Sequence, residues 1–127
     1  MKSGPLRIFF DGGCRPNPGM MEIAAVARGV EYVRRGIGLG DSHQAEWLAL
    51  LHAVDIAIEW GGEDVELIGD SVAVIRVATG KAKPRAGDAH HLAAYRAAVA
   101  AIPRLRLRHI LRSQNLAGIA LAKTHPR

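Results

Sequence analysis

Hydrophobic and polar residues follow two different spacings along this chain, and the spacings predict which segments are strands and which are helices. Short apolar runs bounded by Gly, Pro or Asp are typical of strands, and longer segments with apolar residues three to four positions apart are typical of helices. The predicted strands are Leu6 to Phe10, Glu22 to Arg28, Glu31 to Ile37, Asp64 to Ile68 and Leu105 to Leu111. The predicted helices are Gln44 to Trp60, Ser71 to Thr79, Asp88 to Ala101 and Asn115 to about Lys123.

The order of these elements predicts an α/β domain with a mixed sheet. The first three strands follow one another across short turns, which favours antiparallel pairing, and the later strands each follow a helix. We expect the first strand to end at Asp11, because the Gly/Pro-rich segment up to Gly19 is unfavourable for a strand. No linker or repeat divides the 127 residues, so we expect a single domain, 1–127.

The helix from Gln44 to Trp60 has two distinct sides. We expect its core face to carry Trp47, Leu51, Val54 and Ile58, and its charged face to carry His52, Asp55 and Glu59. Glu46 does not join the charged face, because its position on the helix is close to Leu50 and Ala53. A carboxylate on the packed side of a helix needs a partner.

Composition narrows the class of protein. The single cysteine, Cys14, excludes an intrachain disulfide and a multi-cysteine zinc site. Uncharged runs are too short to span a bilayer, and Met1 to Pro5 lacks the apolar core of a signal peptide. We therefore expect a soluble, cytoplasmic protein without a membrane partner. The sequence leaves the oligomeric state open, with a monomer favoured.

Charge is unevenly distributed along the chain. Residues 1–75 carry 6 Lys or Arg against 11 Asp or Glu, whereas residues 76–127 carry 11 Lys or Arg against Asp88 alone. Such asymmetry is expected where one region gathers carboxylates around cations and another meets a polyanion such as nucleic acid. A solvated basic face that aids solubility is an equally good explanation of the charge alone.

Three carboxylates are candidates for a common site. Asp11 and Asp70 each lie just past an apolar strand and beside a glycine, and the carboxyl ends of neighbouring parallel strands meet at one edge of a sheet. Glu46, near the start of its helix, is the third candidate. Taken singly, Glu46 is explained by the helix dipole, but three carboxylates on three elements favour an oxygen-rich site for Mg²⁺ or Mn²⁺.

Four segments in order resemble the motifs of the ribonuclease H type I family. They are DGGCxPNPG from Asp11, SHQAE from Ser42 to Glu46, GDS from Gly69 to Ser71, and RSQN from Arg112 to Asn115 followed by ALA. The resemblance covers nearly the whole chain and its element order. It implies a ribonuclease H-like fold with a five-stranded mixed sheet flanked by helices, the first three strands antiparallel. The connector Gly80 to Gly87 is short, as in compact relatives without a basic protrusion.

The resemblance also implies an activity, which is hydrolysis of the RNA strand of RNA/DNA hybrids with two divalent ions. Asp11, Glu46 and Asp70 would be the catalytic and metal-binding residues, with Asp11 bridging both ions. Contacts to 2′-hydroxyl groups would distinguish RNA from DNA. The residues that match the substrate-binding positions are Gly12, Gly13, Cys14, Asn17, Ser42, His43, Gln44, Ser71, Arg112 and Asn115.

One position departs from the family pattern. A fourth carboxylate is expected four residues after Asn115, where this chain has Ile119. Isoleucine cannot bind a metal, so we expect weaker binding of the second ion and reduced activity. The alternatives that stay open are a binding module of the same fold that cleaves little or nothing, and an enzyme unrelated to nucleic acid, in which case the motif order is a coincidence.

Overall fold

The structure of the chain, a computed structural model, describes residues 4–123. Its strands are β1 (Leu6–Cys14), β2 (Gly19–Ala27), β3 (Val30–Arg34), β4 (Leu39–Gly40), β5 (Asp64–Gly69) and β6 (Arg104–His109). Its α-helices are α1 (Ser42–Glu59), α2 (Val72–Ala78), α3 (Ala89–Val99) and α4 (Leu116–Ala122), and a single 3₁₀ turn, η1 (Arg112–Gln114), precedes α4. Met1 to Ser3, on which the expectation of no signal peptide partly rests, lie outside the described residues.

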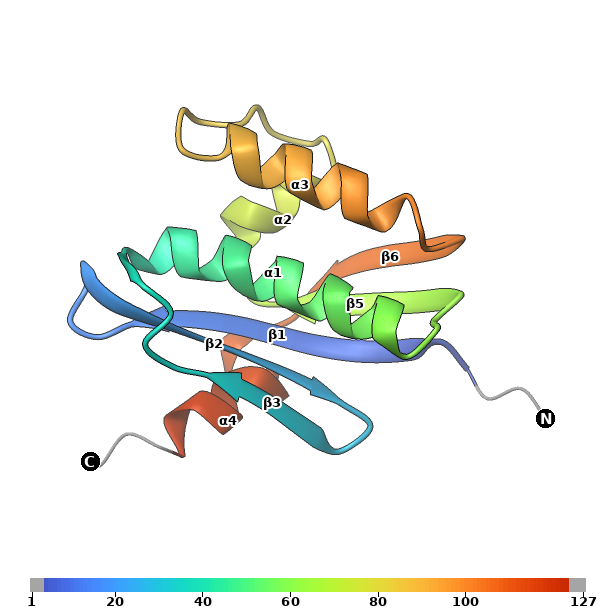
Figure 1. Cartoon of the computed structure of the whole chain (residues 1–127), viewed down its shortest axis with the longest axis horizontal. Helices are drawn as coiled ribbons and strands as arrows, with labels where there is room; N and C mark the ends of the chain where they lie inside the picture. The colour runs from blue at the N-terminus through green and yellow to red at the C-terminus, as the bar shows by residue number, and fades with distance from the viewer. Residues whose placement is uncertain (1–3, 124–127) are drawn as a thin grey trace.

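The sheet has the mixed topology that the sequence predicts. Its main strands are ordered β3-β2-β1-β5-β6, with β1, β2 and β3 antiparallel and with β5 parallel to both β1 and β6. Figure 1 shows α1, α2 and α3 on one side of the sheet and α4 on the other. Between β3 and α1, the short strand β4 pairs with the start of β2 and leads directly into α1.

Two apolar layers hold the helices on the sheet. The larger lies under α1 and α3 and includes Phe10, Trp47 and Leu67, all fully buried. The smaller lies under α4, where Ala117, Ala120 and Leu121 pack on Ala24 and Val26 of β2. Small residues on both surfaces let α4 approach the strands closely, and this brings its first turn to the end of the sheet that holds Asp11.

The first strand is longer than the sequence predicts. β1 does not end at Asp11 but continues through Cys14, because Asp11 to Cys14 stay paired with Ala24 to Met21 of β2. Glycine is unfavourable in a strand when it leaves space unfilled. Here the backbone of α1 fills that space over Gly12, so the strand loses little by having glycine there. Asp11 therefore projects from a paired strand and not from a flexible loop.

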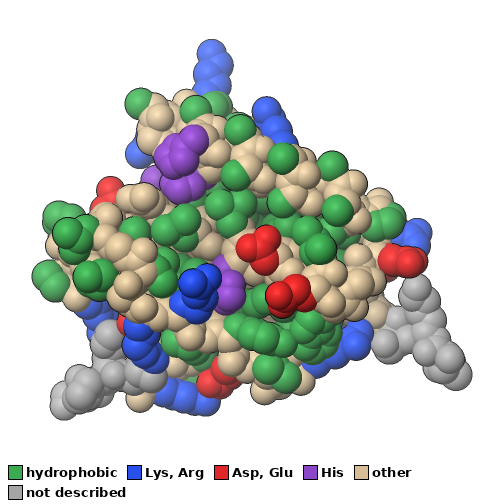
Figure 2. Space-filling model, viewed as in Figure 1, with side chains coloured by type: hydrophobic (Ala, Val, Ile, Leu, Met, Phe, Trp, Pro, Cys, Tyr) green, Lys and Arg blue, Asp and Glu red, His purple; other side chains and the backbone are tan. Residues whose placement is uncertain are grey.

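The core face of α1 also differs in part from the prediction. Trp47 and Val54 are buried as expected, but Ile58 is 42% exposed and Leu51 is half-buried. Leu50, Ala53 and Ala57 are buried in their place. The helix is thus rotated toward the side that carries Glu46, and acidic and apolar side chains share its outer surface (Figure 2).

The α3 start differs as well. Asp88 precedes the helix as predicted, but its side chain makes no cap hydrogen bond to the helix.

Within residues 4–123, no helix is both long and apolar enough to cross a bilayer.

Candidate active site

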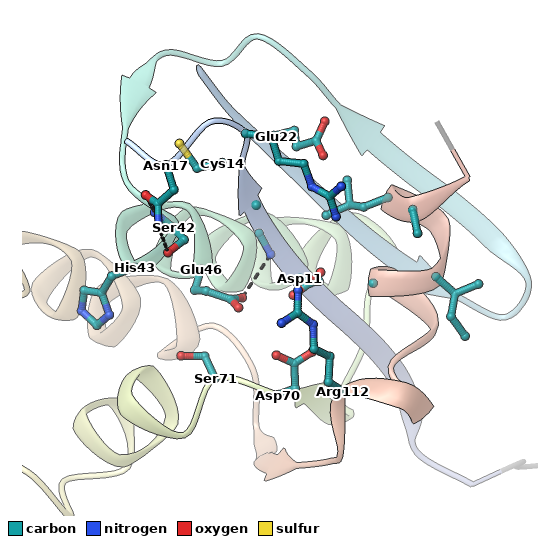
Figure 3. Close-up of a pocket in the computed structure, with 17 residues that line it drawn as sticks. Asp11, Cys14, Asn17, Glu22, Ser42, His43, Glu46, Asp70, Ser71 and Arg112 are labelled. Carbon is teal, nitrogen blue, oxygen red and sulfur yellow. Dashed lines mark hydrogen bonds between the residues drawn. The ribbon is translucent and has the colours of Figure 1, made fainter. Parts of the chain in front are cut away.

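Three carboxylates from three elements converge at one end of the sheet. Asp11 projects from β1, Glu46 from α1, and Asp70 follows β5 directly. One oxygen from each lies within 4.8 Å of the others, and all three side chains point into the same hollow (Figure 3). The predicted convergence is therefore present.

The register of β1 and β5 explains why the two aspartates meet. The strands are parallel neighbours, and Phe9 pairs with Ile68. Asp11 and Asp70 each follow their paired residue by two positions, so they reach the same depth at the edge of the sheet. Hollows of this kind, at the carboxyl ends of strands, are common ligand sites in α/β proteins.

Glu46 reaches the site because α1 lies unusually close to β1. Its Oε1 accepts a 3.0 Å hydrogen bond from the backbone N–H of Gly12. A Cβ atom at Gly12 would collide with the carbonyl group of Ala45. Only glycine allows this approach, and the approach gives Glu46 a fixed position beside Asp11.

Asp70 is held by a residue that lies 45 positions away in the sequence. The amide of Asn115 donates to Asp70 Oδ2 and to the carbonyl of Phe10, each at 2.9 Å. The Oδ1 of Asn115 accepts a hydrogen bond from the N–H of Ala117 and so caps α4, as the sequence predicts. Asn115 is fully buried and thus connects β1, α4 and the acidic site.

The crowded carboxylates affect one another's ionisation. Burial, followed by the nearby charge of Asp70, raises the pKa of Asp11 to about 7. Burial, followed by the charges of Asp11 and Asp70, raises the pKa of Glu46 to about 9. Without a cation the site keeps protons near neutral pH, because three adjacent negative charges are costly to hold together. A site with these properties can bind a divalent metal ion, which replaces the protons.

The carboxylates lie in a groove of about 650 Å³. On one side of it Asn17 and Ser42 join the loop after β1 to the start of α1 through hydrogen bonds of 2.9 and 3.1 Å. On the other side are Arg112 of η1 and Ile119 of α4. The residues lining the groove are Asp11, Gly12, Gly13, Cys14, Arg15, Asn17, Glu22, Ser42, His43, Glu46, Asp70, Ser71, Arg112, Gly118, Ile119, Leu121 and Ala122.

Eight of the ten predicted substrate-binding residues line this groove, namely Gly12, Gly13, Cys14, Asn17, Ser42, His43, Ser71 and Arg112. Gln44 is not among the lining residues. It lies one helical step away from the groove, with its side-chain oxygen against Gly40 of β4. Asn115 is also not among them, because its amide is buried and used by Asp70 and the backbone.

Sequence reasoning missed two charged residues of the groove. Glu22 of β2 pairs with Gly13 across the strands, is 8% exposed, and forms a 3.0 Å ion pair with Arg35. Arg15 lies in the loop after β1. Side chains alternate between the two faces of a strand, so Glu22 lies on the same face of β2 as Ala24 and Val26, which pack under α4. This alternation could have identified Glu22 once β1 was known to extend to Cys14.

Ile119, at the position where the family resemblance predicts a carboxylate, lies at the groove. Its side chain is 46% exposed and lines the groove. The preceding residue, Gly118, lies so close to the site that a Cβ atom there would be 3.2 Å from Asp11 Oδ2. The first turn of α4 therefore borders the carboxylates, and Ile119 presents an apolar side chain there.

Comparison with known proteins points in one direction. Residues 10–125 match the family described as reverse transcriptase-like. A ribonuclease HI of Halobacterium salinarum is 36% identical over 84 residues, which cover 62% of this chain. The match spans 42% of that protein's length, so this chain corresponds to less than half of it.

Solved structures show the same fold. The crystal structure of RNase H1 from Halobacterium salinarum superposes with a TM-score of 0.85 at 30% identity, covering 93% of this chain and 94% of that one. The structure of LC11-RNase H1 in complex with an RNA/DNA hybrid superposes with a TM-score of 0.78 at 26% identity, covering 87% and 88%.

Proposed function

The chain belongs to the reverse transcriptase-like family and has the ribonuclease H type I fold, and from this we propose that it is an endoribonuclease that hydrolyses the RNA strand of RNA/DNA hybrids. One observation carries the proposal. Asp11, Glu46 and Asp70 meet in a single groove, with one oxygen of each within 4.8 Å of the others. The relative solved with an RNA/DNA hybrid supports the choice of substrate.

The residues of the site fit a divalent cation. All three side chains are carboxylates, which hard cations such as Mg²⁺ and Mn²⁺ prefer, and the raised pKa values of Asp11 and Glu46 are those expected of crowded carboxylates without a cation, which supports the proposal. Asp11, Glu46 and Asp70 would hold the ions. Bound there, two such ions supply the Lewis acidity and the positive charge that phosphodiester hydrolysis requires.

The chain's own residues place the substrate and the ligands. The Gly12 N–H and the Asn115 amide hold Glu46 and Asp70 in position, so the carboxylates need not reorganise when substrate arrives. Asn17, Ser42 and His43 at one rim are available to the sugar and phosphate groups of the hybrid. Arg112 at the other rim supplies a positive charge for a phosphate, and the charge of Arg112 also opposes the rise in the pKa of Asp11.

The exposed Ile119 favours a second candidate function. With an apolar side chain bordering the carboxylates, the site has one negative charge fewer for a second cation than the family pattern provides. In the extreme case the chain would bind hybrids and cleave them poorly or not at all. A cytoplasmic location and a monomeric state complete the proposal, and cell fractionation and light scattering of the purified chain test them.

The test is cleavage of a hybrid with a labelled RNA strand in Mg²⁺ or Mn²⁺, run beside Asp70→Asn. The variant keeps an oxygen that can accept from Asn115 and removes only the charge. We expect RNA products with the wild-type chain. With Asp70→Asn we expect the cleavage rate to fall by roughly a hundredfold or more. Binding without cleavage under both metals supports the binding-module candidate. Equal activity of the two chains places the reaction at another site.

A further inference from the structure

Beside the groove, a buried carboxylate joins α3 to α1. Asp88 is 1% exposed, although it directly precedes α3 in the sequence and resembles a helix cap. Its Oδ1 lies 2.7 Å from His43 Nε2 and accepts from Trp47 Nε1 at 2.9 Å. Its Oδ2 accepts from the backbone N–H of Arg85 at 2.9 Å. The Asp88 side chain thus contacts Arg85 in the Gly80 to Gly87 connector, the buried Trp47 of α1, and His43 at the groove.

These hydrogen bonds determine the charge of Asp88. Burial alone raises the pKa of the carboxyl group, but the hydrogen bonds from the Arg85 amide, His43 and Trp47 together lower it below its ordinary value. An ionised carboxylate can only accept hydrogen bonds. His43 Nε2 must therefore carry a proton, since it lies 2.7 Å from an acceptor.

The same contact determines which nitrogen of His43 is left for a ligand. When Nε2 donates to Asp88, the other ring nitrogen, Nδ1, has no part in that bond. The His43 side chain is 37% exposed and lines the groove, whereas the side chain of its partner Asp88 is only 2% exposed. Figure 3 shows His43 at the start of α1, next to Ser42 and Asn17.

The support behind His43 lies in the core. Trp47, which shares Asp88 Oδ1 with His43, is fully buried and stacks on His91 of α3 with ring centroids 5.9 Å apart and an angle of 12° between the planes. A change in the Asp88 position would disturb this packing. The Asp88 carboxylate is therefore held by Trp47 of α1 and by the Arg85 backbone before α3. From this position it can orient the half-exposed His43 ring through a single hydrogen bond.

We propose that Asp88 is a positioning residue that orients His43 so that Nδ1 contacts a 2′-hydroxyl of the RNA strand. The proposal rests on the proposed function. A 2′-hydroxyl both donates and accepts, so it pairs with Nδ1 whether or not that nitrogen carries a proton. A DNA strand lacks the hydroxyl and loses the contact. Asp88 thereby contributes to the preference for RNA although it does not touch the substrate.

The first experiment concerns the free protein and needs no substrate. Nitrogen-15 NMR, with the His43 signals assigned from His43→Ala, reports which ring nitrogen carries the proton. We expect the Nε2–H form in the wild-type chain and in Trp47→Phe, and a mixture of both forms in Asp88→Ala, which removes the acceptor of the Nε2 proton. Trp47→Phe is the matched control, because it removes the other donor to the same oxygen. A wild-type ring protonated on Nδ1 alone, or an unchanged ring in Asp88→Ala, overturns the proposal.

The second experiment measures binding in EDTA, where no metal supports cleavage, at one fixed salt concentration. The ligands are an RNA/DNA hybrid and the same hybrid with 2′-fluoro groups in place of the RNA hydroxyls. We expect His43→Ala to weaken binding of the RNA hybrid about three- to tenfold more than binding of the fluoro hybrid, the size of one hydrogen bond. Asp88→Ala should act in the same direction but not add to His43→Ala.

The outcomes separate this proposal from the proposed function. Equal losses for both ligands in His43→Ala, or an additive loss in the double variant, mean that Asp88 only joins α3 to α1. Failure of the wild-type chain to bind any hybrid both in EDTA and in Mg²⁺ removes the proposed function and the hydroxyl contact with it, while the NMR result still decides whether Asp88 orients His43. Because His43 is half-exposed, His43→Ala keeps the test valid even where Asp88→Ala fails to fold.

Discussion

Asn115 and Asp70, 45 positions apart in the sequence, are joined by a 2.9 Å hydrogen bond between the buried amide and the carboxylate. The same amide bonds the Phe10 carbonyl, directly before Asp11, and its oxygen caps α4. One side chain thus fixes the relative positions of two acidic residues and of the helix that borders them. The site is built into the core and does not depend on a mobile loop.

Asn115→Ala should therefore be strongly destabilising. The change removes a helix cap and leaves a buried carbonyl without its partner, which together cost about 2 to 4 kcal/mol in the free energy of unfolding. Urea denaturation measures the loss. Gln114→Ala, at the neighbouring exposed position, should change stability by less than about 0.5 kcal/mol. Equal stability of the two variants would contradict the role given to Asn115.

Gly12→Ala should separate α1 from β1. The new methyl group collides with the Ala45 carbonyl, and we expect a loss of more than about 2 kcal/mol together with a loss of metal binding as Glu46 moves. Gly13→Ala is the control for stability, because a methyl group there meets no atom closer than 3.8 Å. Thermal unfolding of both variants decides the matter. A Gly12→Ala chain as stable as Gly13→Ala would mean that the close approach is not needed.

The metal-free chain should lose stability as pH rises. The pKa values of Asp11 and Glu46 increase on folding, from 3.8 to about 7 and from 4.5 to about 9, so the folded state binds more protons between pH 4 and 9. Their contribution is complete below pH 4 and is lost as pH rises through 7 and 9. Urea denaturation in EDTA across this range measures the change.

Glu46→Gln provides the control for this pH dependence. The amide keeps an acceptor for the Gly12 N–H but does not titrate, so the variant should gain stability relative to wild type as pH rises. Mg²⁺ should stabilise the wild-type chain more at pH 9 than at pH 5, because binding requires ionised carboxylates. Parallel pH profiles for the two chains would show that the site is not short of positive charge.

Ile119→Asp should improve cleavage at low Mg²⁺. The side chain is exposed in the groove, so the substitution buries no charge and costs little stability, while the new carboxylate adds a fourth ligand beside Asp11. We expect the Mg²⁺ concentration for half-maximal cleavage to fall roughly tenfold, as for one added charge interaction. Ile119→Asn has nearly the same shape without the charge and should show no such shift. If both variants match wild type, position 119 does not face the second ion.

The acidic site itself was predictable because its members obey local rules. Asp11 and Asp70 both follow apolar strands, and parallel neighbouring strands bring such residues together. Glu46 stood out because it lies on the packed side of an otherwise amphipathic helix. These three features require only the sequence and the strand order.

Other parts of the site depend on contacts between distant segments. Asp88 has the local pattern of a helix cap, and only the packing of α3 on α1 shows that it bonds His43 and Trp47. The continuation of β1 through Gly12 could not be predicted either, because glycine is favourable there only when the backbone of another element fills the space over it. Gln44 was assigned to the groove from its motif, but the rotation of α1 directs it toward β4.

The most direct test of the three-carboxylate site uses a hybrid with different labels on its RNA and DNA strands. The wild-type chain is incubated with it in Mg²⁺, in Mn²⁺ and in EDTA, and both strands are analysed on a denaturing gel. We predict internal cuts in the RNA strand with either metal, an intact DNA strand throughout, and no products in EDTA. Cleavage that persists in EDTA, or an intact RNA strand in a hybrid that the chain demonstrably binds in both metals, would contradict the account.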